Sequence, residues 1–135
     1  MEKNKWILIS LFLIAVLIWW ISKPSNDTTV VYHLEEGFKG CFTVYFNESN
    51  GKELEDIDDT LLILVPKDGK VLTSSSYKAA FSDRGLYKEK AFYVDKNGKI
   101  ISEINVLEFP DPIISGKHFS ERYMRTFDPN QEGCY

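Results

Sequence analysis

The longest apolar run of the chain lies near its N-terminus, where 17 residues, 6–22 (WILISLFLIAVLIWWIS), carry no charged side chain. As an α-helix this run would be about 25 Å long, slightly shorter than the roughly 30 Å hydrocarbon core of a bilayer. Lysine residues on both sides can reach the interfaces, and two tryptophan residues near its end suit the headgroup region. Because the run is apolar on every side, it predicts one transmembrane helix and disfavours a helix of a soluble domain.

A cleaved signal peptide is the alternative, because it shares the basic start and the apolar centre. Cleavage needs small residues at the −1 and −3 positions, and no such pair precedes Lys23. We therefore expect an uncleaved signal anchor in residues 1–23, a polar linker in 24–29 and a separate domain in 30–135. Two lysines, Lys3 and Lys5, precede the run, which predicts a cytoplasmic N-terminus and an extracytoplasmic domain.

After the linker the pattern changes to short apolar stretches, rich in β-branched and aromatic residues, that turn signals separate. Residues 61–65 (LLILV) are apolar without alternation, which predicts a central strand covered on both faces. The pattern predicts a mostly β domain, a small antiparallel sandwich or open barrel of about seven strands. The clearest strand candidates are residues 30–34, 40–46, 61–65, 70–73, 91–94 and 99–104.

Turn residues divide these stretches, and two of the turns predict hairpins. Residues 66–69 (PKDG) would return 70–73 against the preceding strand, and 95–98 (DKNG) would return 99–104 in the same way. Glycine at such places tolerates a positive φ, so we interpret the turn residues as structural. They are Gly37, Gly40, Pro66, Asp68, Gly69, Asn97 and Gly98.

Two segments allow more than one structure. Residues 74–90 form a long polar and aromatic connection, with room for a helical turn near residues 77–81. In the tail, Phe119, Tyr123 and Phe127 recur every four residues, as in a helix, whereas the stretch ERYMRTF suits a terminal strand. We expect a strand, because the rest of the domain is β.

The charge balance narrows the choice of partners. The chain has 16 basic and 20 acidic residues, and leaving out residues 1–23 gives 13 − 19 = −6 for the outer part. An acidic domain is unsuited to nucleic acid, so no nucleic-acid partner is expected. The acidic stretch 53–59 (ELEDIDD) lacks the spacing of a calcium loop, and we interpret it as a solvated loop.

The chain has two cysteines, Cys41 and Cys134. In an oxidising compartment they can pair, and the bridge would close a loop of about 94 residues, worth about 4–5 kcal/mol in the chain-entropy model. Two independent free thiols are the alternative, because the sequence does not give the Cα separation that a bridge needs.

No residue pattern predicts an active site. Ser75 and Lys78 match the S-x-x-K motif of penicillin-recognising enzymes, but the K-T-G element is absent. The spacing of His33 and Cys41 differs from the sortase pattern, and His33 and His118 lack further ligands for zinc. We therefore predict no catalytic, cofactor-binding or metal-binding residue.

Three motifs together resemble a family of small, uncharacterised bacterial exported domains, which are often anchored by a lipid or one helix. Residues 34–40 (LEEGFKG) resemble a PxG(Y/F)xG pattern, whose proline is absent here. Residues 65–75 (VPKDGKVLTSS) resemble an (I/V)PxDG pattern, and 91–99 (AFYVDKNGK) resemble a third. The resemblance covers residues 31–105 and implies an envelope protein without assigned activity.

These observations favour a membrane-anchored, extracytoplasmic and non-enzymatic binding module at the cell envelope. Its partners would be the membrane, through one helix, and an unidentified protein, peptide or envelope polymer. No cofactor is expected. The alternatives are a small hydrolase or transpeptidase that uses Cys41 as its nucleophile, and an immunity or accessory protein for a secreted toxin or transporter.

Overall fold

The structure is a computed structural model that describes residues 13–16, 18, 28–116, 122–128, 130–131 and 134. Most of the anchor predicted in residues 6–22 lies outside these residues. Residues 13–16 and 18 are helical. Within the described part of the chain, no helix has both the length and the apolar character that crossing a membrane requires.

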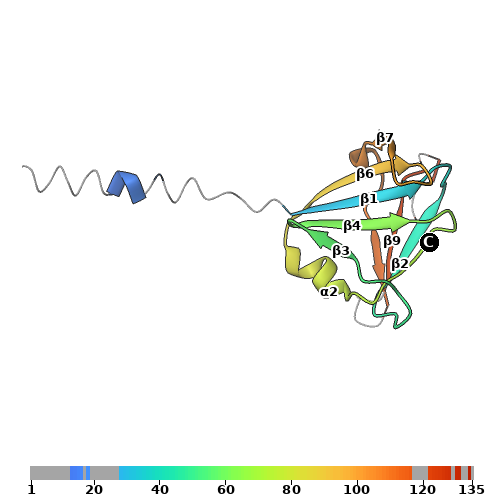
Figure 1. The fold of residues 1–135 in the computed structure, drawn as a ribbon, viewed down its shortest axis with the longest axis horizontal. Helices are drawn as coiled ribbons and strands as arrows, with labels where there is room; N and C mark the ends of the chain where they lie inside the picture. Colours follow the sequence, from blue (N-terminus) through green and yellow to red (C-terminus); the bar gives the residue numbers. More distant parts are fainter. Residues whose placement is uncertain are drawn as a thin grey trace, which may run out of the picture.

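The domain that follows consists of two mixed β-sheets (Figure 1). The first sheet has five strands in the order β3-β4-β1-β6-β7. The second has four strands in the order β5-β2-β9-β8. The strands are β1 (Thr29–Glu35), β2 (Cys41–Tyr45), β3 (Glu55–Ile57), β4 (Thr60–Val65), β5 (Lys70–Leu72), β6 (Lys88–Val94), β7 (Ile100–Ile104), β8 (Ile113–Ser115) and β9 (Arg122–Thr126).

Three short helical segments accompany the strands of this domain: the α-helix α2 (Tyr77–Ala80) and the 3-10 helices η1 (Ser82–Arg84) and η2 (Val106–Glu108). The α2 helix confirms the helical turn expected near residues 77–81. The Ser76 hydroxyl accepts a hydrogen bond from the Ala79 N–H, and this bond caps the helix. The expected terminal strand is also present as β9, whereas residues 117–121 of the tail, with His118 and Phe119, lie outside the described residues.

The prediction of a mostly β domain is confirmed. The prediction of a small antiparallel sandwich or open barrel of about seven strands is wrong, because the described residues form nine strands and three of the strand pairings are parallel. In the first sheet β1 runs parallel to both β4 and β6, and in the second β2 runs parallel to β5. The reason is that the chain alternates between sheets, so that β1 and β4 are joined through the other layer. A strand that returns in this way can run in the same direction as its neighbour.

The first predicted hairpin is also wrong, whereas the second is confirmed. The turn at residues 66–69 carries the chain from β4 to the other sheet, where β5 pairs with β2. The Thr43 N–H donates a hydrogen bond to the Gly69 carbonyl, and this bond holds the start of β5 beside β2. The second hairpin forms as expected, with β6 antiparallel to β7.

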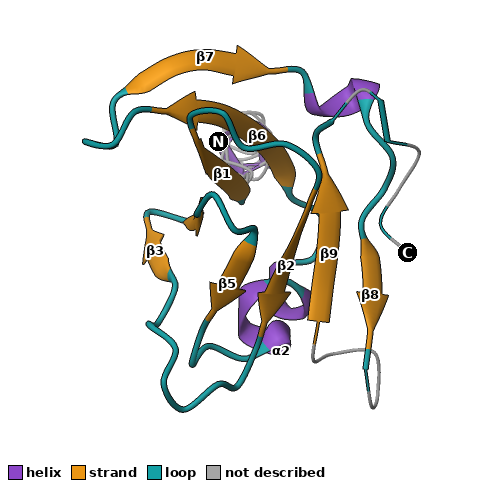
Figure 2. Cartoon of the chain, turned by 90° about the vertical axis from the view of Figure 1, so that its right-hand side faces the viewer, coloured by secondary structure: helices purple, strands orange, loops and turns teal. Residues whose placement is uncertain are grey.

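The core lies between the two sheets and is strongly aromatic. The strands of the second sheet cross those of the first (Figures 1 and 2), and the inner faces of both supply its side chains. Aromatic rings contribute large apolar areas to a domain that is otherwise small. The buried aromatic residues are Tyr32, Phe38, Phe42, Phe46, Phe81, Tyr123 and Phe127.

Candidate functional site

A cleft of about 520 Å³ lies at the carboxyl ends of the three parallel strands β4, β1 and β6. In α/β sheets, ligands also bind where parallel strands end, and the volume is within the usual range for ligand pockets. Four separate parts of the chain line this carboxyl-end cleft: residues 52–55, residues 64–66 with 70–72, residues 33 and 35, and residues 94–96 with 98. Figure 2 looks onto this end of the domain, with β5 beside β3 and the β6–β7 turn above them.

The floor of the carboxyl-end cleft is apolar and partly open to solvent. Leu64 of β4 is 53% exposed, although its neighbours in the strand, Ile63 and Val65, are buried. The prediction that residues 61–65 are covered on both faces is therefore wrong, because the outer face of the first sheet is left open here. Leu54 and Leu72 add further apolar surface to the cleft. Exposed apolar residues that gather in a hollow are typical of a binding surface.

Charged side chains of both signs surround this floor, and most of them already have a partner. Lys52 pairs with Glu55 at 2.9 Å, and Glu35 lies 3.9 Å from Lys67. The Asp95 carboxylate accepts hydrogen bonds from two backbone N–H groups of its own turn.

His33 lies on the outer face of β1 in the carboxyl-end cleft, and its ring meets that of Phe92 edge to face at 6.0 Å. Burial lowers the pKa of His33 from its ordinary value of 6.5. The imidazole is therefore neutral at neutral pH, and it offers one donor and one acceptor to a ligand.

Some of the turn residues predicted from the sequence lie at the carboxyl-end cleft, and the others lie outside it. Pro66 and Gly98 line the carboxyl-end cleft, and Asn97 donates its N–H to the Asp95 carboxylate beside it. Asp68 accepts a hydrogen bond from the Lys70 N–H. Gly37 lies in a separate shallow hollow of about 230 Å³. Turns that the sequence marks as structural thus also form part of the rim.

Gly69 has a plain steric role. Its φ is +67°, and a Cβ at this position would come within 2.8 Å of the Cys41 carbonyl oxygen. Gly40 has a φ of +95°, and its carbonyl accepts a hydrogen bond from the Thr126 hydroxyl. Only glycine fits position 69 without displacing the start of β2.

The structure joins Cys41 to Cys134, the pairing that the sequence left open. Cys41 begins β2, next to Thr126 of β9, and Cys134 is buried. The bridge therefore fixes the end of the chain to the second sheet. Both thiols are consumed, so neither is free to act as a nucleophile while the bridge is intact.

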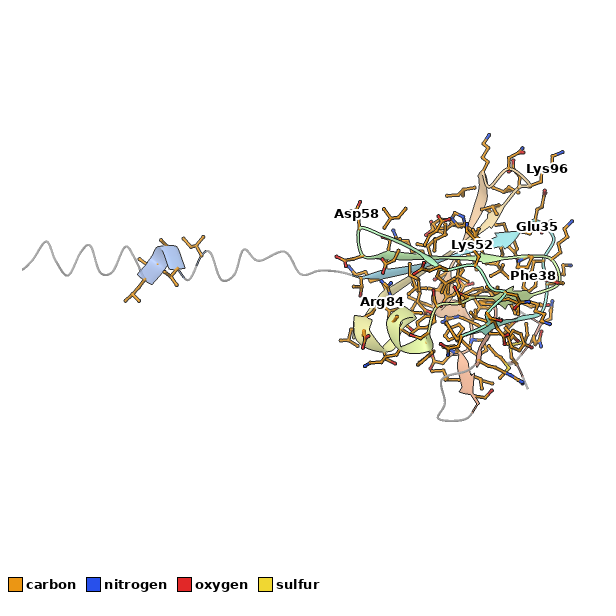
Figure 3. All side chains as sticks on the ribbon, turned by 60° about the horizontal axis from the view of Figure 1, so that its bottom comes forward. Glu35, Phe38, Lys52, Asp58, Arg84 and Lys96 are labelled. Atoms are coloured by element: carbon orange, nitrogen blue, oxygen red, sulfur yellow. A yellow bond between two sulfur atoms is a disulfide. The ribbon has the colours of Figure 1, made fainter. Side chains whose placement is uncertain are left out.

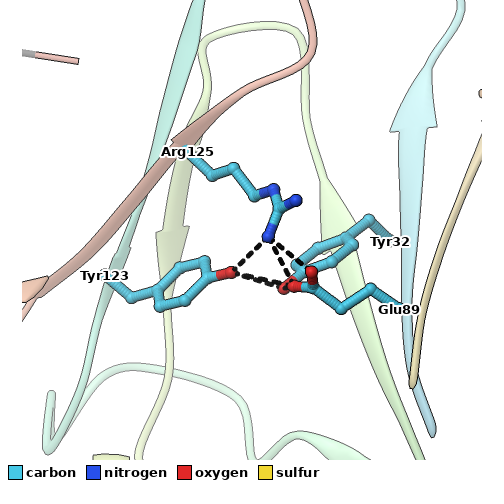
Figure 4. Close-up of polar contacts among 4 residues, drawn as sticks. All are labelled: Tyr32, Glu89, Tyr123 and Arg125. Carbon is cyan, nitrogen blue, oxygen red and sulfur yellow. Dashed lines mark hydrogen bonds and ion pairs between the residues drawn. The ribbon is translucent and has the colours of Figure 1, made fainter. Parts of the chain in front are cut away.

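A buried polar cluster joins the two sheets (Figure 4). The Arg125 guanidinium of β9 donates to both oxygens of Glu89 of β6, at 2.6 and 2.7 Å. The Tyr32 hydroxyl of β1 donates to Glu89 at 2.8 Å and lies 2.6 Å from the Tyr123 hydroxyl. Arg125 is 3% exposed and Glu89 18%. Because each charge is neutralised within the cluster, we assign it a structural role, not a binding role.

The cluster predicts that the domain loses stability at alkaline pH. Burial, together with the nearby Glu89 charge, raises the pKa of Tyr32 and Tyr123 well above 10.0 and that of Tyr87 to about 12. Above pH 10 the folded chain keeps protons that the unfolded chain releases, so a rising pH favours unfolding. We expect urea midpoints of the full chain to be constant near pH 8 and to fall between pH 10 and 12. Tyr87→Phe should make the urea midpoint fall less steeply with pH. A midpoint that stays constant up to pH 12 would contradict the raised pKa values of these tyrosines.

Sequence reasoning missed the residues that matter most in both places. Leu64 was hidden in an apolar run, and residues 53–54 were assigned to a solvated acidic loop, the central part of which forms β3 (Glu55–Ile57). Glu89 and Arg125 had no motif around them. Among the described residues, no group of three or more His, Cys, Asp or Glu side chains is arranged to hold a metal ion.

Comparison with known proteins identifies a family and a similar fold. The model of the "Family of unknown function (DUF6843)" matches residues 26–117. A crystal structure described as "Putative Lipoprotein from Bacillus anthracis" has a similar fold, with a TM-score of 0.58 and 15% sequence identity. The similarity covers 78% of this chain and 73% of that one. No curated protein matches the chain.

Proposed function

The chain belongs to the DUF6843 family of unknown function, and for this member we propose the role of a non-enzymatic binding module outside the cell membrane. In this proposal the N-terminal apolar run is the anchor, and the carboxyl-end cleft is the binding site. The observation that carries the proposal is the position of this cleft at the far end of β1 from the tether.

The direction of the strands supports this orientation. Six residues, 23–28, separate the apolar run from β1. They span at most roughly 22 Å, so the amino end of β1 stays close to the membrane in this proposal. The seven residues of β1 extend about 20 Å at the usual rise per residue. The cleft therefore faces away from the membrane. Figure 3 is consistent with this arrangement, since Glu35 and Lys96 lie at the end opposite Asp58 and Arg84.

Two further observations support an envelope role. The similar fold belongs to a protein described as a "Putative Lipoprotein", which supports an envelope-associated role. The disulfide between Cys41 and Cys134 suits an oxidising compartment outside the cytoplasm. It also counts against the alternative of a cysteine hydrolase, because that enzyme would need Cys41 as a free thiolate.

The proposal predicts that envelope components can be cross-linked to the carboxyl-end cleft on intact cells. Three lysines, Lys52, Lys70 and Lys96, line the cleft, so a membrane-impermeant, amine-reactive cross-linker can capture a bound component. We expect adducts with the full chain expressed in a Gram-positive host. Leu64→Asp should abolish them, because it places a charge on the apolar floor. Leu107→Asp is the matched control, since Leu107 is 90% exposed and lies outside the cleft.

Two results would contradict the proposal. Equal adducts from the wild type and both variants would show that the cleft has no role. Reaction of the domain only after the cells are broken would show that it does not face outward.

A further inference from the structure

We infer that the carboxyl-end cleft binds an extended peptide, which pairs with the free edge of β5; this inference rests on the proposed function and names its ligand. β5 is the edge strand of the second sheet, because the strand order begins with it. Proteins with an open strand edge bind peptides by adding them as a further strand.

The hydrogen-bond pattern shows which groups of β5 are available. The Thr43 N–H donates to the Gly69 carbonyl, and the Thr73 N–H donates to the Tyr45 carbonyl. Groups that point to one side alternate along a strand, so the main-chain groups of residues 69, 71 and 73 face β2. Those of Lys70 and Leu72 face the other way.

Leu72 is the residue that a peptide would meet first. Its main-chain N–H and carbonyl have no partner within the described chain, whereas the Lys70 N–H is already bonded to the Asp68 carboxylate at 3.0 Å. Leu72 also lines the carboxyl-end cleft. An unpaired strand edge beside an apolar floor provides both components of strand addition: main-chain bonds for affinity and hollows for alternate side chains.

Charges at the two ends of the cleft favour a peptide over an uncharged polymer. Glu53 and Lys96 line the cleft, and neither has an ion pair or hydrogen bond within the described residues. Lys96 lies in the β6–β7 turn, and Glu53 lies just before β3. In Figure 2 the β6–β7 turn lies above β5, and the segment that leads into β3 lies toward the lower end of β5. An extended segment along this edge would place a basic group near Glu53 and an acidic group near Lys96.

The test uses two capped, fluorescent synthetic peptides, Lys-Val-Thr-Val-Glu and Glu-Val-Thr-Val-Lys, because the strand direction is not fixed by the charges. Anisotropy is measured with the full chain in non-ionic micelles. We expect one of the two orders to bind at least tenfold more tightly. Leu72→Pro should weaken it about tenfold, since proline removes the outward N–H while the β2–β5 bonds remain. Leu72→Val keeps the N–H and shortens the side chain, so it measures the contribution of the side chain separately from that of the N–H.

Charge reversal and peptide methylation keep the inference testable if Leu72→Pro does not fold. Glu53→Lys should weaken the preferred peptide, and exchanging its lysine for glutamate should restore the affinity. In an extended peptide, alternate amides point to opposite edges. N-methylation of the amides that face β5 should abolish binding, whereas N-methylation of the amides on the other edge should leave it unchanged. Equal effects of both sets would overturn strand pairing. Cross-linked adducts from the cleft without binding of either peptide would overturn the peptide ligand and leave the proposed function standing.

Discussion

Arg125→Met is expected to lower the free energy of unfolding by about 3–5 kcal/mol, because it leaves the Glu89 carboxylate largely buried without its cation. Glu89 is 18% exposed, and its remaining partners would be the hydroxyls of Tyr32 and Tyr123. Two hydroxyl donors do not replace an ion pair that binds both oxygens. The loss should appear as a lower urea midpoint of the full chain in non-ionic micelles, without a change in slope.

The matched control for this change is Lys52→Met. Lys52 pairs with Glu55 at 2.9 Å, but its side chain is 78% exposed, so the same substitution should change stability by less than about 1 kcal/mol. The double variant Arg125→Met/Glu89→Met should recover part of the loss, because no buried charge then remains. If Arg125→Met costs no more than Lys52→Met, the cluster does not hold the sheets together.

Loss of the disulfide should lower the free energy of unfolding by an amount similar to that expected for Arg125→Met. Replacing Cys41 and Cys134 together by serine opens a bridge between residues 93 positions apart, which the chain-entropy model values at about 4–5 kcal/mol. The effect is large because the bridge joins the first residue of β2 to a residue that follows the last strand. Urea titrations of the full chain, with and without reductant, measure it.

The reductant provides the control for the serine variant. Wild-type chain in reductant should unfold at the midpoint of the double variant, and reductant should not affect the double variant itself. The single variant Cys134→Ser should have the same urea midpoint as the double variant and as the wild-type chain in reductant. A difference of less than about 1 kcal/mol between oxidised and reduced wild type would show that the loop is already constrained in the unfolded chain.

The local part of the fold could be predicted from the sequence, and the pairing of the strands could not. Short stretches rich in β-branched and aromatic residues located β1 and β2, and the turn at residues 95–98 located the β6–β7 hairpin. The turn at residues 66–69 was also recognised, but a turn does not determine which sheet the next strand joins. That choice depends on hydrogen bonds between distant residues, such as the one from Thr43 to Gly69.

The carboxyl-end cleft could not be predicted because four separate segments form it. One signal was present in the apolar run at residues 61–65. A strand that is buried on one face alone should alternate, and Leu64 breaks this pattern by remaining apolar where it is exposed. Departures from a folding rule of this kind are expected where a surface is kept for binding.

Site-specific photocross-linking on intact cells tests the central claim most directly. A benzoylphenylalanine is placed at Leu64, in the carboxyl-end cleft, or at Leu86, which is 99% exposed. The Leu86 carbonyl accepts a hydrogen bond from the Thr28 hydroxyl, so this position marks the amino end of β1, near the tether. We predict a discrete adduct with an envelope component from Leu64 and none from Leu86. The same adduct from Leu86, with none from Leu64, would contradict both the site and its orientation.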